Sequence, residues 1–336
     1  RNIAALNSTT GLPTGNNPIM PDYTATVTNV RAVPSSNFEL QSDGNRFEDS
    51  QRQLHVGAIH KYAKLHIDYD AAHSESLVRQ NDGHNSSEIG SGGFFRTWLT
   101  GVGWTIDKTS DPAKPRFIQT AGPSIFDLRN YTNSELHKRN NERNGILNSA
   151  SANVKYLFDG KETSYIKAGA RVRRQTAEEI GRDRRWSYSG PDGIYGVNPS
   201  TGMRDDDLSI FAFPGVQTSE SQRNGPFPYT HIGTVGEHVK KNPALWTENL
   251  YYTNTQKYIG TRKVTEDVTA AYIMGGTQWG KLRAVGGIRN ESTEVKSQGY
   301  VRSRTLATAA QIPDPVARAD ADYNNFRVIR GSYDNL

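Results

Sequence analysis

The chain has 336 residues, of which only 35% are hydrophobic, and its mean hydropathy is −0.71. No stretch approaches the roughly 20 apolar residues of a membrane-spanning helix, which excludes a helical membrane protein but not a β-barrel, whose strands need an apolar residue only at every second position. The 40 basic and 35 acidic residues are interspersed, which indicates a mixed surface more than a nucleic-acid footprint, and the absence of cysteine excludes zinc–thiolate sites, disulfides and cysteine nucleophiles.

The first third of the chain contains two predicted strands and the first predicted hairpin. Runs of β-branched residues predict a strand over 22–33, and a second strand is predicted over 38–46. A hairpin follows, with arms at 54–60 and 64–72 about a turn at 61–63. In its second arm an apolar set alternates with a polar set: Leu65, Ile67, Tyr69 and Ala71 against His66, Asp68 and Asp70. Because side chains of a strand alternate between its two faces, the first set is expected to face an apolar environment and the second set water.

The region after this hairpin has a weaker pattern. Residues 94–106 predict one more strand, although their alternation is imperfect. Residues 107–144 are polar, contain three prolines and predict a long connection. Within it, 133–144 predict either a short helix or a solvated loop, because nearly every residue is polar. The run His137-Lys138-Arg139 is expected to face solvent.

The second hairpin covers residues 152–175 around the turn Asp159-Gly160-Lys161. Its apolar positions alternate regularly through both arms: Ala152, Val154, Tyr156 and Phe158, then Ile166, Ala168, Ala170 and Val172. The opposite face of the second arm holds three cations and a glycine, namely Lys167, Arg171, Arg173 and Gly169. This alternation again predicts one apolar face and one face exposed to water.

The third hairpin covers residues 262–302, with its turn at 278–280. We expect one apolar face to combine residues of both arms: Val264, Val268, Ala270, Tyr272 and Met274, then Leu282, Ala284, Gly286 and Ile288. Arg283, Arg289 and Glu291 fall on the other face. The following residues 303–325 predict a loop, and 326–329 begin another strand.

The connections alternate between short and long. The turns at 61–63, 159–161 and 278–280 are tight. The remaining connections are long, at 73–93, 107–144, 176–258 and 303–325. Short turns on one rim and long loops on the other are typical of an outer-membrane barrel.

A soluble β-sandwich with elaborated loops also has one apolar face on each sheet and remains the alternative architecture. The two differ in what the apolar face contacts. If it contacts lipid, a set of apolar side chains should be exposed in the protein alone: Ile166, Ala168, Val172, Tyr272 and Ile288.

The third hairpin resembles a known family. Val264-Thr-Glu-Asp-Val-Thr-Ala-Ala-Tyr-Ile-Met, followed by Gly280-Lys-Leu-Arg-Ala-Val-Gly-Gly-Ile-Arg-Asn-Glu-Ser-Thr, resembles a hairpin of TonB-dependent outer-membrane receptors. In that family a strand of the type E-D-x-x-A-A-Y precedes G-x-L-x-x-x-x-G-x-R-x-E-x-T. Asn290 stands where an aromatic residue is common. Leu54-His-Val-Gly-Ala-Ile and Lys64-Leu-His-Ile-Asp-Tyr-Asp resemble an earlier hairpin of the same barrel.

The resemblance implies an all-β fold, an antiparallel meander of long hairpins that forms part of a transmembrane β-barrel of the 22-stranded type, with long extracellular loops. Nothing in residues 1–336 resembles the plug domain or the last strands of that family. We therefore expect an internal fragment of the barrel domain. Its first and last strands are not expected to pair with each other.

The resemblance also implies a function. Such receptors bind a scarce nutrient, an iron chelate, cobalamin or an oligosaccharide, in the bacterial outer membrane and import it with energy supplied by TonB. The implied partners are the nutrient, the TonB complex acting through the plug, and outer-membrane lipid with lipopolysaccharide; nucleic acid is not among them. A secreted or surface β-sandwich that binds carbohydrate without transport is the alternative.

The predicted ligand-binding surface is the segment 176–258 with the arm that leads to it. Arginine forks suit carboxylate or catecholate groups, and an indole or phenol ring can stack on a sugar or an aromatic ligand. The residues assigned to the ligand on this basis are Arg171, Arg173, Arg182, Arg185, Trp186 and Tyr188. Alternatively, the arginines pair with Glu178, Glu179 and Asp183, or bind lipopolysaccharide phosphates.

Other chemistry is poorly supported by the sequence. Asp205-Asp206-Asp207 could hold calcium, but it lacks the spacing of a calcium loop and a solvated acidic turn is the preferred interpretation. The histidines between 55 and 73 share no metal-ligand spacing. There is no nucleophile elbow and no P-loop. We therefore predict no enzyme activity, no catalytic residue, no metal site and no cofactor.

Overall fold

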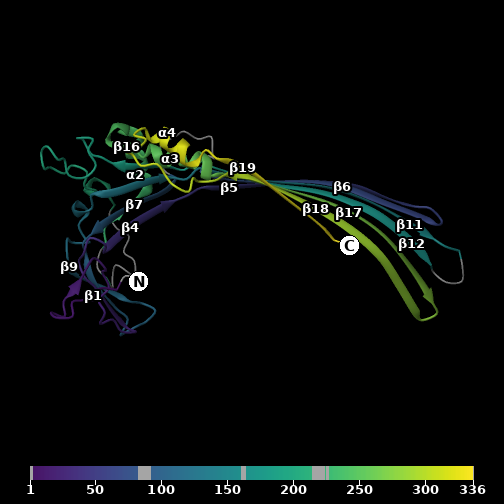
Figure 1. The fold of residues 1–336 in the computed structure, drawn as a ribbon, viewed down its shortest axis with the longest axis horizontal. Coiled ribbons are helices and arrows are strands. Elements are labelled where there is room, and N and C mark those ends of the chain that lie inside the picture. Colours follow the sequence, from purple (N-terminus) through teal and green to yellow (C-terminus); the bar gives the residue numbers. More distant parts are fainter. Residues whose placement is uncertain (1–2, 82–91, 160–163, 214–223, 225–226, 336) are drawn as a thin grey trace. The chain divides into compact units, whose positions relative to one another are not determined.

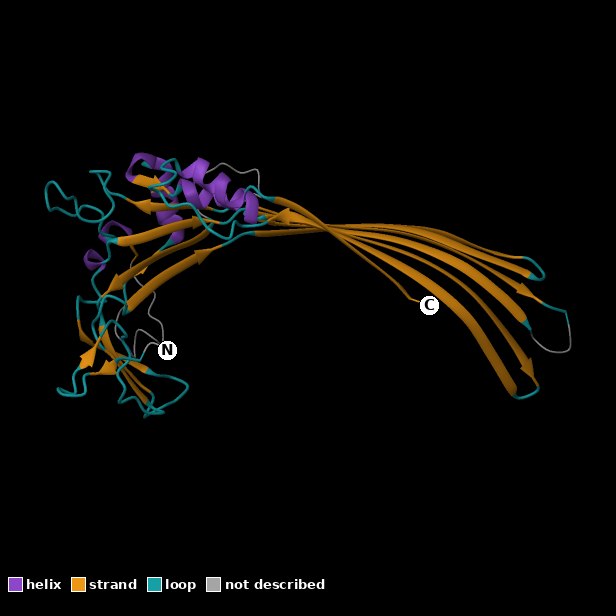
Figure 2. Ribbon diagram, in the orientation of Figure 1, coloured by secondary structure: helices purple, strands orange, loops and turns teal. Residues whose placement is uncertain are grey.

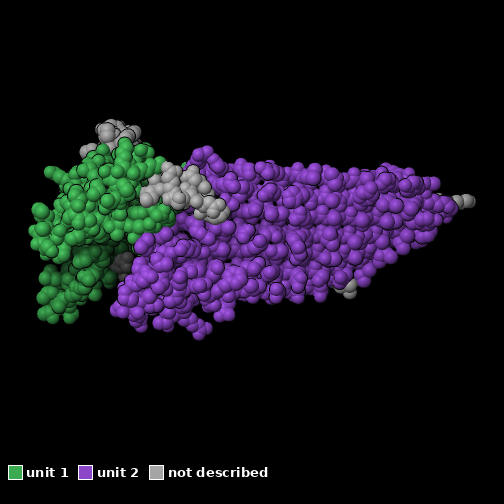
Figure 3. All heavy atoms as spheres, turned by 90° about the horizontal axis from the view of Figure 1, so that it is seen from above, with its two compact units in different colours: residues 1–45, 87–139, 184–249 green, residues 46–86, 140–183, 250–336 purple. Residues whose placement is uncertain are grey.

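Antiparallel β-structure dominates the fold, with strands making up 55% and helices 13% of the residues that the structure describes. The computed structural model describes residues 3–81, 92–159, 164–213, 224 and 227–335. The chain divides into two compact units (Figure 3). Unit 1 comprises residues 1–45, 87–139 and 184–249, and unit 2 comprises residues 46–86, 140–183 and 250–336.

Unit 2 is built on one seven-stranded antiparallel sheet in the order β19-β18-β17-β12-β11-β6-β5 (Figure 1). The strands are β5 (Phe47–Lys61), β6 (Leu65–Gln80), β11 (Asn141–Leu157), β12 (Tyr165–Gly181), β17 (Thr261–Trp279), β18 (Leu282–Tyr300) and β19 (Phe326–Asn335). The first six strands have 15 to 19 residues, whereas strands of globular proteins usually have about 5 or 6. They lie side by side along their whole length (Figure 2).

All three predicted hairpins are confirmed by the pairing of β5 with β6, of β11 with β12 and of β17 with β18. Residues 160 and 161 of the second predicted turn lie outside the described residues. β5 and β19 form the two edges of the sheet, and in the described part of the chain neither has a second partner strand. The prediction that the first and last strands do not close a barrel is therefore confirmed for these strands.

The register gives this sheet two chemically different faces. Directly opposed residues of antiparallel strands lie on the same face. One continuous row consists of Ile67, Val154, Ala168, Ile273 and Ile288. We call the face that carries this row the apolar face. The adjacent row consists of Asp68, Asn153, Gly169, Tyr272 and Arg289, and we call its side the polar face.

The third hairpin differs from its prediction in one respect. Trp279 pairs with Leu282, so the turn is the two residues Gly280 and Lys281 and not 278–280. This change by one residue reverses which side chains share a face. The polar face therefore carries the five β17 residues that were expected on the apolar face, namely Val264, Val268, Ala270, Tyr272 and Met274. Ile288 does lie on the apolar face, opposite Ile273.

Two helices in unit 2 replace parts of the predicted loops. α3 (Leu250–Ile259) lies in the predicted connection 176–258 and contacts β12, β17 and β18. α4 (Pro315–Tyr323) lies in the predicted loop 303–325. Asp314 begins α4 by accepting hydrogen bonds from the backbone N–H groups of Val316 and Ala317, and proline follows it at the first helical position. The Tyr251 hydroxyl joins the helices by donating to Asp322 at 2.6 Å.

Unit 1 is built on a five-stranded antiparallel sheet in the order β16-β13-β10-β7-β4. These strands are β4 (Asn37–Gly44), β7 (Gly93–Thr100), β10 (Asn133–Lys138), β13 (Arg184–Tyr188) and β16 (Trp246–Glu248). A three-stranded sheet consists of β3 (Val27–Val30), β8 (Gly103–Asp107) and β9 (Arg116–Ala121). Two further sheets have two strands each. One pairs β1 (Ala5–Leu6) with β2 (Pro13–Thr14), and the other pairs β14 (Ala212–Phe213) with β15 (Tyr229–Thr230). The helices are α2 (Ile232–Lys241) and the short η1 (Leu128–Asn130), η2 (Ser209–Phe211) and η3 (Pro243–Leu245).

The core of unit 1 is aromatic. The rings of Phe95, Tyr188, Phe211 and Trp246 contact one another in edge-on or tilted pairs with centroids 5.3 to 6.3 Å apart. Val235 and Val239 of α2 are fully buried against this cluster. Aromatic residues bury a large apolar area each, which lets a small sheet support a core.

The sequence predicts unit 1 less well than unit 2. The strand predicted over 94–106 is two strands, separated by Gly101 with φ +71°. The interpretation of 133–144 as a short helix or loop was wrong, because these residues form β10 and the start of β11. His137 and Lys138 are 5% and 2% exposed, so the expected solvent exposure was also wrong. Among the described residues, the predicted connections 107–144 and 176–258 each contain several strands and at least one helix.

Candidate functional site

The polar face of unit 2 carries the largest group of charged side chains on one surface of the sheet. Its charged residues include Asp68, Asp70, Lys155, Lys167, Arg171, Arg173, Glu266, Arg289 and Glu291. Both signs are interspersed, so the surface offers donors and acceptors to a polar ligand without one dominant charge.

Local contacts order part of this face. Arg173 forms an ion pair with Glu266 on the neighbouring strand. The Tyr272 hydroxyl donates to Oδ1 of Asn153 at 2.8 Å, and the Asn153 amide donates to Asp68 at 3.3 Å. Tyr272 also covers Gly169, where an added Cβ would lie 2.7 Å from the ring. The face is therefore held by cross-strand contacts that the sequence pattern alone does not show.

Two of the predicted ligand residues, Arg171 and Arg173, lie on the polar face of β12. Arg171 is exposed and lies in register with Ser151 and Ala270. Arg182 follows the end of β12 and is engaged locally. Its Nη1 donates to the Gly181 carbonyl at 2.7 Å and to the Thr261 hydroxyl at 3.0 Å.

The other three predicted ligand residues lie in β13 and belong to unit 1, not to unit 2. Trp186 is 2% exposed and Tyr188 is 4% exposed. The Tyr188 ring packs edge-on against Phe211, with centroids 5.3 Å apart. Both rings therefore belong to the hydrophobic core. The prediction that they stack on a ligand was wrong, because they are not accessible to one. They were assigned to the ligand because their rings can stack on one, and their own sequence does not show that they are buried in the core of unit 1.

Arg185 belongs to a buried ion network around Glu135 that the sequence did not reveal. The Glu135 carboxylate accepts hydrogen bonds from Arg96 at 2.6 and 2.9 Å and from Arg185 at 3.2 Å. Nε2 of His137 lies 2.8 Å from the same carboxylate. The His137 ring also stacks on Phe94, with centroids 4.1 Å apart. Three side chains from the strands β7, β10 and β13 thus share one carboxylate.

The network has clear electrostatic consequences. Burial by itself raises the pKa of Glu135, but the hydrogen bonds from His137 and Arg96 and the charge of Arg185 lower it to about 2. Burial lowers the pKa of His137, which Glu135 only partly counteracts. Glu135 is therefore ionised at neutral pH and neutralises the nearby arginines, as buried charges require.

The acidic run 205–207 is not a solvated turn. Asp206 is fully buried, and burial raises its pKa although the backbone N–H of Gly196 donates to it at 2.6 Å. Asp205 accepts from the backbone N–H of Asp192 at 2.8 Å. In the part of the chain that the structure describes, no three His, Asp or Glu side chains are arranged to hold a metal ion. The run instead holds the loop that follows β13.

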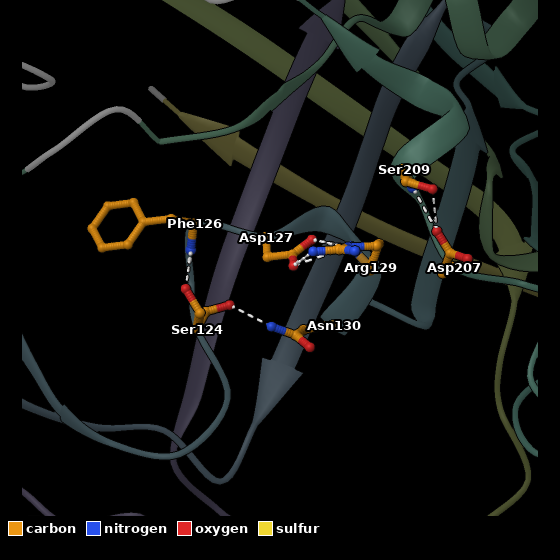
Figure 4. A network of polar contacts seen from close by, with 7 residues as sticks. All are labelled: Ser124, Phe126, Asp127, Arg129, Asn130, Asp207 and Ser209. Carbon is orange, nitrogen blue, oxygen red and sulfur yellow. Dashed lines mark hydrogen bonds and ion pairs between the residues drawn. The ribbon is translucent and has the colours of Figure 1, made fainter.

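An exposed polar network on unit 1 surrounds η1 (Figure 4). Arg129, whose side chain is 75% exposed, forms a forked ion pair with Asp127 through N–O distances of 2.6 to 3.0 Å. The Asn130 amide donates to the Ser124 carbonyl at 2.9 Å. Asp207 adds negative charge near Arg129 and accepts a hydrogen bond from the backbone N–H of Ser209 at 2.9 Å. Exposed pairs of this kind contribute little to stability.

No helix among the described residues combines the length and the apolarity needed to cross a membrane. Comparison with models of protein families, with curated proteins and with solved structures gave no match.

Proposed function

We propose that the sheet of unit 2 is part of the wall of a bacterial outer-membrane β-barrel. One observation carries this proposal: the apolar side chains of one face are exposed, while the other face is charged. Ile166, Val172 and Ile288 are 41%, 51% and 55% exposed, and Ala168 is exposed as well. Tyr272 is half-buried because it lies on the polar face. A lipid-facing wall leaves such side chains uncovered in the protein alone.

The extent of the apolar face supports the proposal. Along β11 and the residue after it, every side chain on this face from Phe158 to Ala150 is apolar, and Asn148 is the first polar one. At about 3.4 Å per residue, the nine residues from Phe158 to Ala150 span roughly 27 Å along the strand, and a tilted strand needs about 9 to 11 residues to cross a membrane. The pairing of every backbone group along these strands also meets the requirement of a hydrocarbon environment.

We further propose that the protein is an active-transport receptor that binds a scarce nutrient, an iron chelate or an oligosaccharide, and imports it with TonB-supplied energy. The support is the resemblance of the third hairpin to that receptor family together with a polar face suited to line a lumen. Arg171 and Arg173 would meet the solute on that face. A protonophore, which collapses the proton gradient, should therefore stop uptake of the nutrient. Uptake that continues unchanged in its presence would contradict this part of the proposal.

The wall itself can be tested because the chain contains no cysteine. We propose two single-cysteine variants, Ile273→Cys on the apolar face and Met274→Cys as the matched control on the polar face. Each carries a nitroxide label in outer membranes. The Ile273 label should collide more with oxygen, which dissolves in lipid, and the Met274 label more with a water-soluble nickel chelate.

Equal accessibility of both labels to the nickel chelate would contradict a lipid-facing wall. It would favour the alternative, a soluble β-sandwich that binds carbohydrate. That alternative requires a second layer over the apolar face.

A further inference from the structure

The apolar face ends in a groove that carries an unusual group of cations. Beyond the row of Val172, the face turns polar at Arg174, Asp267 and Glu294. The groove follows, with a volume of about 390 Å³. It is lined by Arg174, Thr176, Lys263, Thr265, Asp267, Glu294, Val295, Lys296, Gln298 and Arg330. Nine of these ten residues lie on the same side of the sheet as the apolar row, beyond its end. Only Val295 lies on the opposite side.

The centre of the groove is one row of the sheet. Thr176, Thr265, Lys296 and Arg330 are directly opposed across β12, β17, β18 and β19. The row therefore presents two hydroxyls, an ammonium and a guanidinium side by side, with neighbouring strands about 4.8 Å apart. These are the groups that bind phosphate oxygens.

Lys296 and Arg330 are like charges in directly opposed positions, an arrangement that destabilises a sheet. Two other charged pairs in the region are already satisfied. Arg174 forms a forked pair with Asp267 at 2.6 and 3.0 Å. Lys263 lies 3.7 Å from Glu178.

Among the described residues, neither Lys296 nor Arg330 has a carboxylate within 4.0 Å. Glu294 is the one remaining carboxylate of the groove lining, and it belongs to a neighbouring row. An anion between the two cations would remove their repulsion.

We propose that this groove binds the phosphate of an anionic lipid head group, with the phosphate between Lys296 and Arg330. The inference rests on the proposed function, since it places the groove at the border between lipid chains and water. The position of the cations favours a lipid over a soluble anion, because they lie on the same face as the apolar band and directly beyond its end. A molecule with both an acyl chain and a phosphate matches both surfaces.

The test uses the full chain in detergent micelles and diphosphorylated lipid A as the probe, with binding measured by native mass spectrometry. The protein should retain this lipid more strongly than the same lipid after enzymatic removal of its phosphates. The double variant Lys296→Gln, Arg330→Gln should bind the phosphorylated lipid about ten- to thirty-fold more weakly, because each cation near a membrane surface contributes about a tenfold effect or less.

A matched control removes the same charge from the other end of the hairpin. The double variant Lys281→Gln, Arg283→Gln lies at the turn between β17 and β18 and should bind lipid A like the unmodified chain. An unchanged circular dichroism spectrum and unfolding midpoint of both variants in the same micelles establish that they fold.

Three results would overturn the inference. One is equal retention of phosphorylated and dephosphorylated lipid. Another is an equal loss of binding in both double variants. The third is complete displacement of the lipid by excess inorganic phosphate, which would make the groove a site for free phosphate. Each is separable from failure of the proposed function, because the nitroxide labels at positions 273 and 274 report membrane contact whether or not lipid phosphate binds.

Discussion

At the scale of single residues, Glu135 is the charged group on which unit 1 depends most. Its carboxylate is the shared partner of Arg96, Arg185 and His137. Removing the charge leaves two half-buried guanidinium groups without their carboxylate, and breaking buried pairs costs about 3 to 5 kcal/mol. Sequence reasoning missed this residue because Arg96 and Arg185 come from two other strands and become its neighbours only in the folded sheet.

We predict that Glu135→Gln lowers the free energy of unfolding of unit 1 by about 3 kcal/mol at pH 7. Urea unfolding followed by tryptophan fluorescence measures it, because four of the five tryptophans lie in unit 1. Glu237→Gln is the matched control, since Glu237 lies in an exposed pair 3.9 Å from Lys240. The control should change stability by well under about 1 kcal/mol, and an equal loss in both variants would refute the role of the network.

The lowered pKa of Glu135 also predicts how the stability of unit 1 depends on pH. The pKa of Glu135 is about 2 in the folded protein against its ordinary 4.5. A lowered carboxylate pKa contributes stability that is fully present above pH 4.5 and is lost as the pH falls toward 2. The difference in unfolding free energy between the unmodified chain and Glu135→Gln should therefore shrink steadily over this range. A difference that stays constant from pH 5 to pH 2 would contradict the assigned pKa.

At the scale of elements, the turn between β17 and β18 determines which side chains face the apolar side. Gly280 has φ +54°, a left-handed conformation that glycine adopts without strain. An added Cβ there would meet nothing within 4 Å, so a substitution costs backbone strain only. The sequence predicted the hairpin correctly, but a turn placed one residue away assigned Tyr272 to the wrong face.

We predict that Gly280→Val lowers the free energy of unfolding of unit 2 by about 1 to 2 kcal/mol, the cost of a left-handed conformation for a residue with a Cβ. Gly280→Asn should cost less, because asparagine tolerates this conformation. Gly286→Val tests whether a bulky side chain alone is responsible, because a Cβ there also meets open space and its φ is not left-handed. The urea midpoint in detergent measures all three, and equal loss at positions 280 and 286 would contradict the explanation.

At the scale of the whole molecule, the sheet of unit 2 exposes both an apolar face and two edges. On the apolar face, Val56 of β5 is 58% exposed and Val328 of β19 is 44% exposed. Unpaired edges next to apolar side chains favour strand addition between copies of a chain. The described strands therefore combine the two features that cause β-proteins to aggregate in water.

We predict that the chain aggregates in detergent-free buffer and is monodisperse in micelles, with the same β-sheet content by circular dichroism in micelles as in outer membranes. Sedimentation velocity distinguishes the two states. A folded, monodisperse monomer without detergent would contradict the membrane-wall proposal and favour the β-sandwich alternative.

The sequence determined the hairpins of unit 2 by itself. Period-two alternation and tight turns are local properties, and they suffice to predict β5 with β6, β11 with β12 and β17 with β18. The same alternation predicted which residues of β6, β11 and β12 share a face. It failed in residues 133–144, where a nearly all-polar run forms β10 because its charges are neutralised by partners from other strands.

Only the tertiary structure decided the rest. It divided the six predicted ligand residues between two units and placed Trp186 and Tyr188 in a core, because burial depends on what packs against a strand and not on the strand's own pattern. It also brought Thr176, Thr265, Lys296 and Arg330 into one row from positions up to 154 residues apart. Strand register creates such neighbours, and register is set by pairing across the sheet, which no single segment of sequence contains.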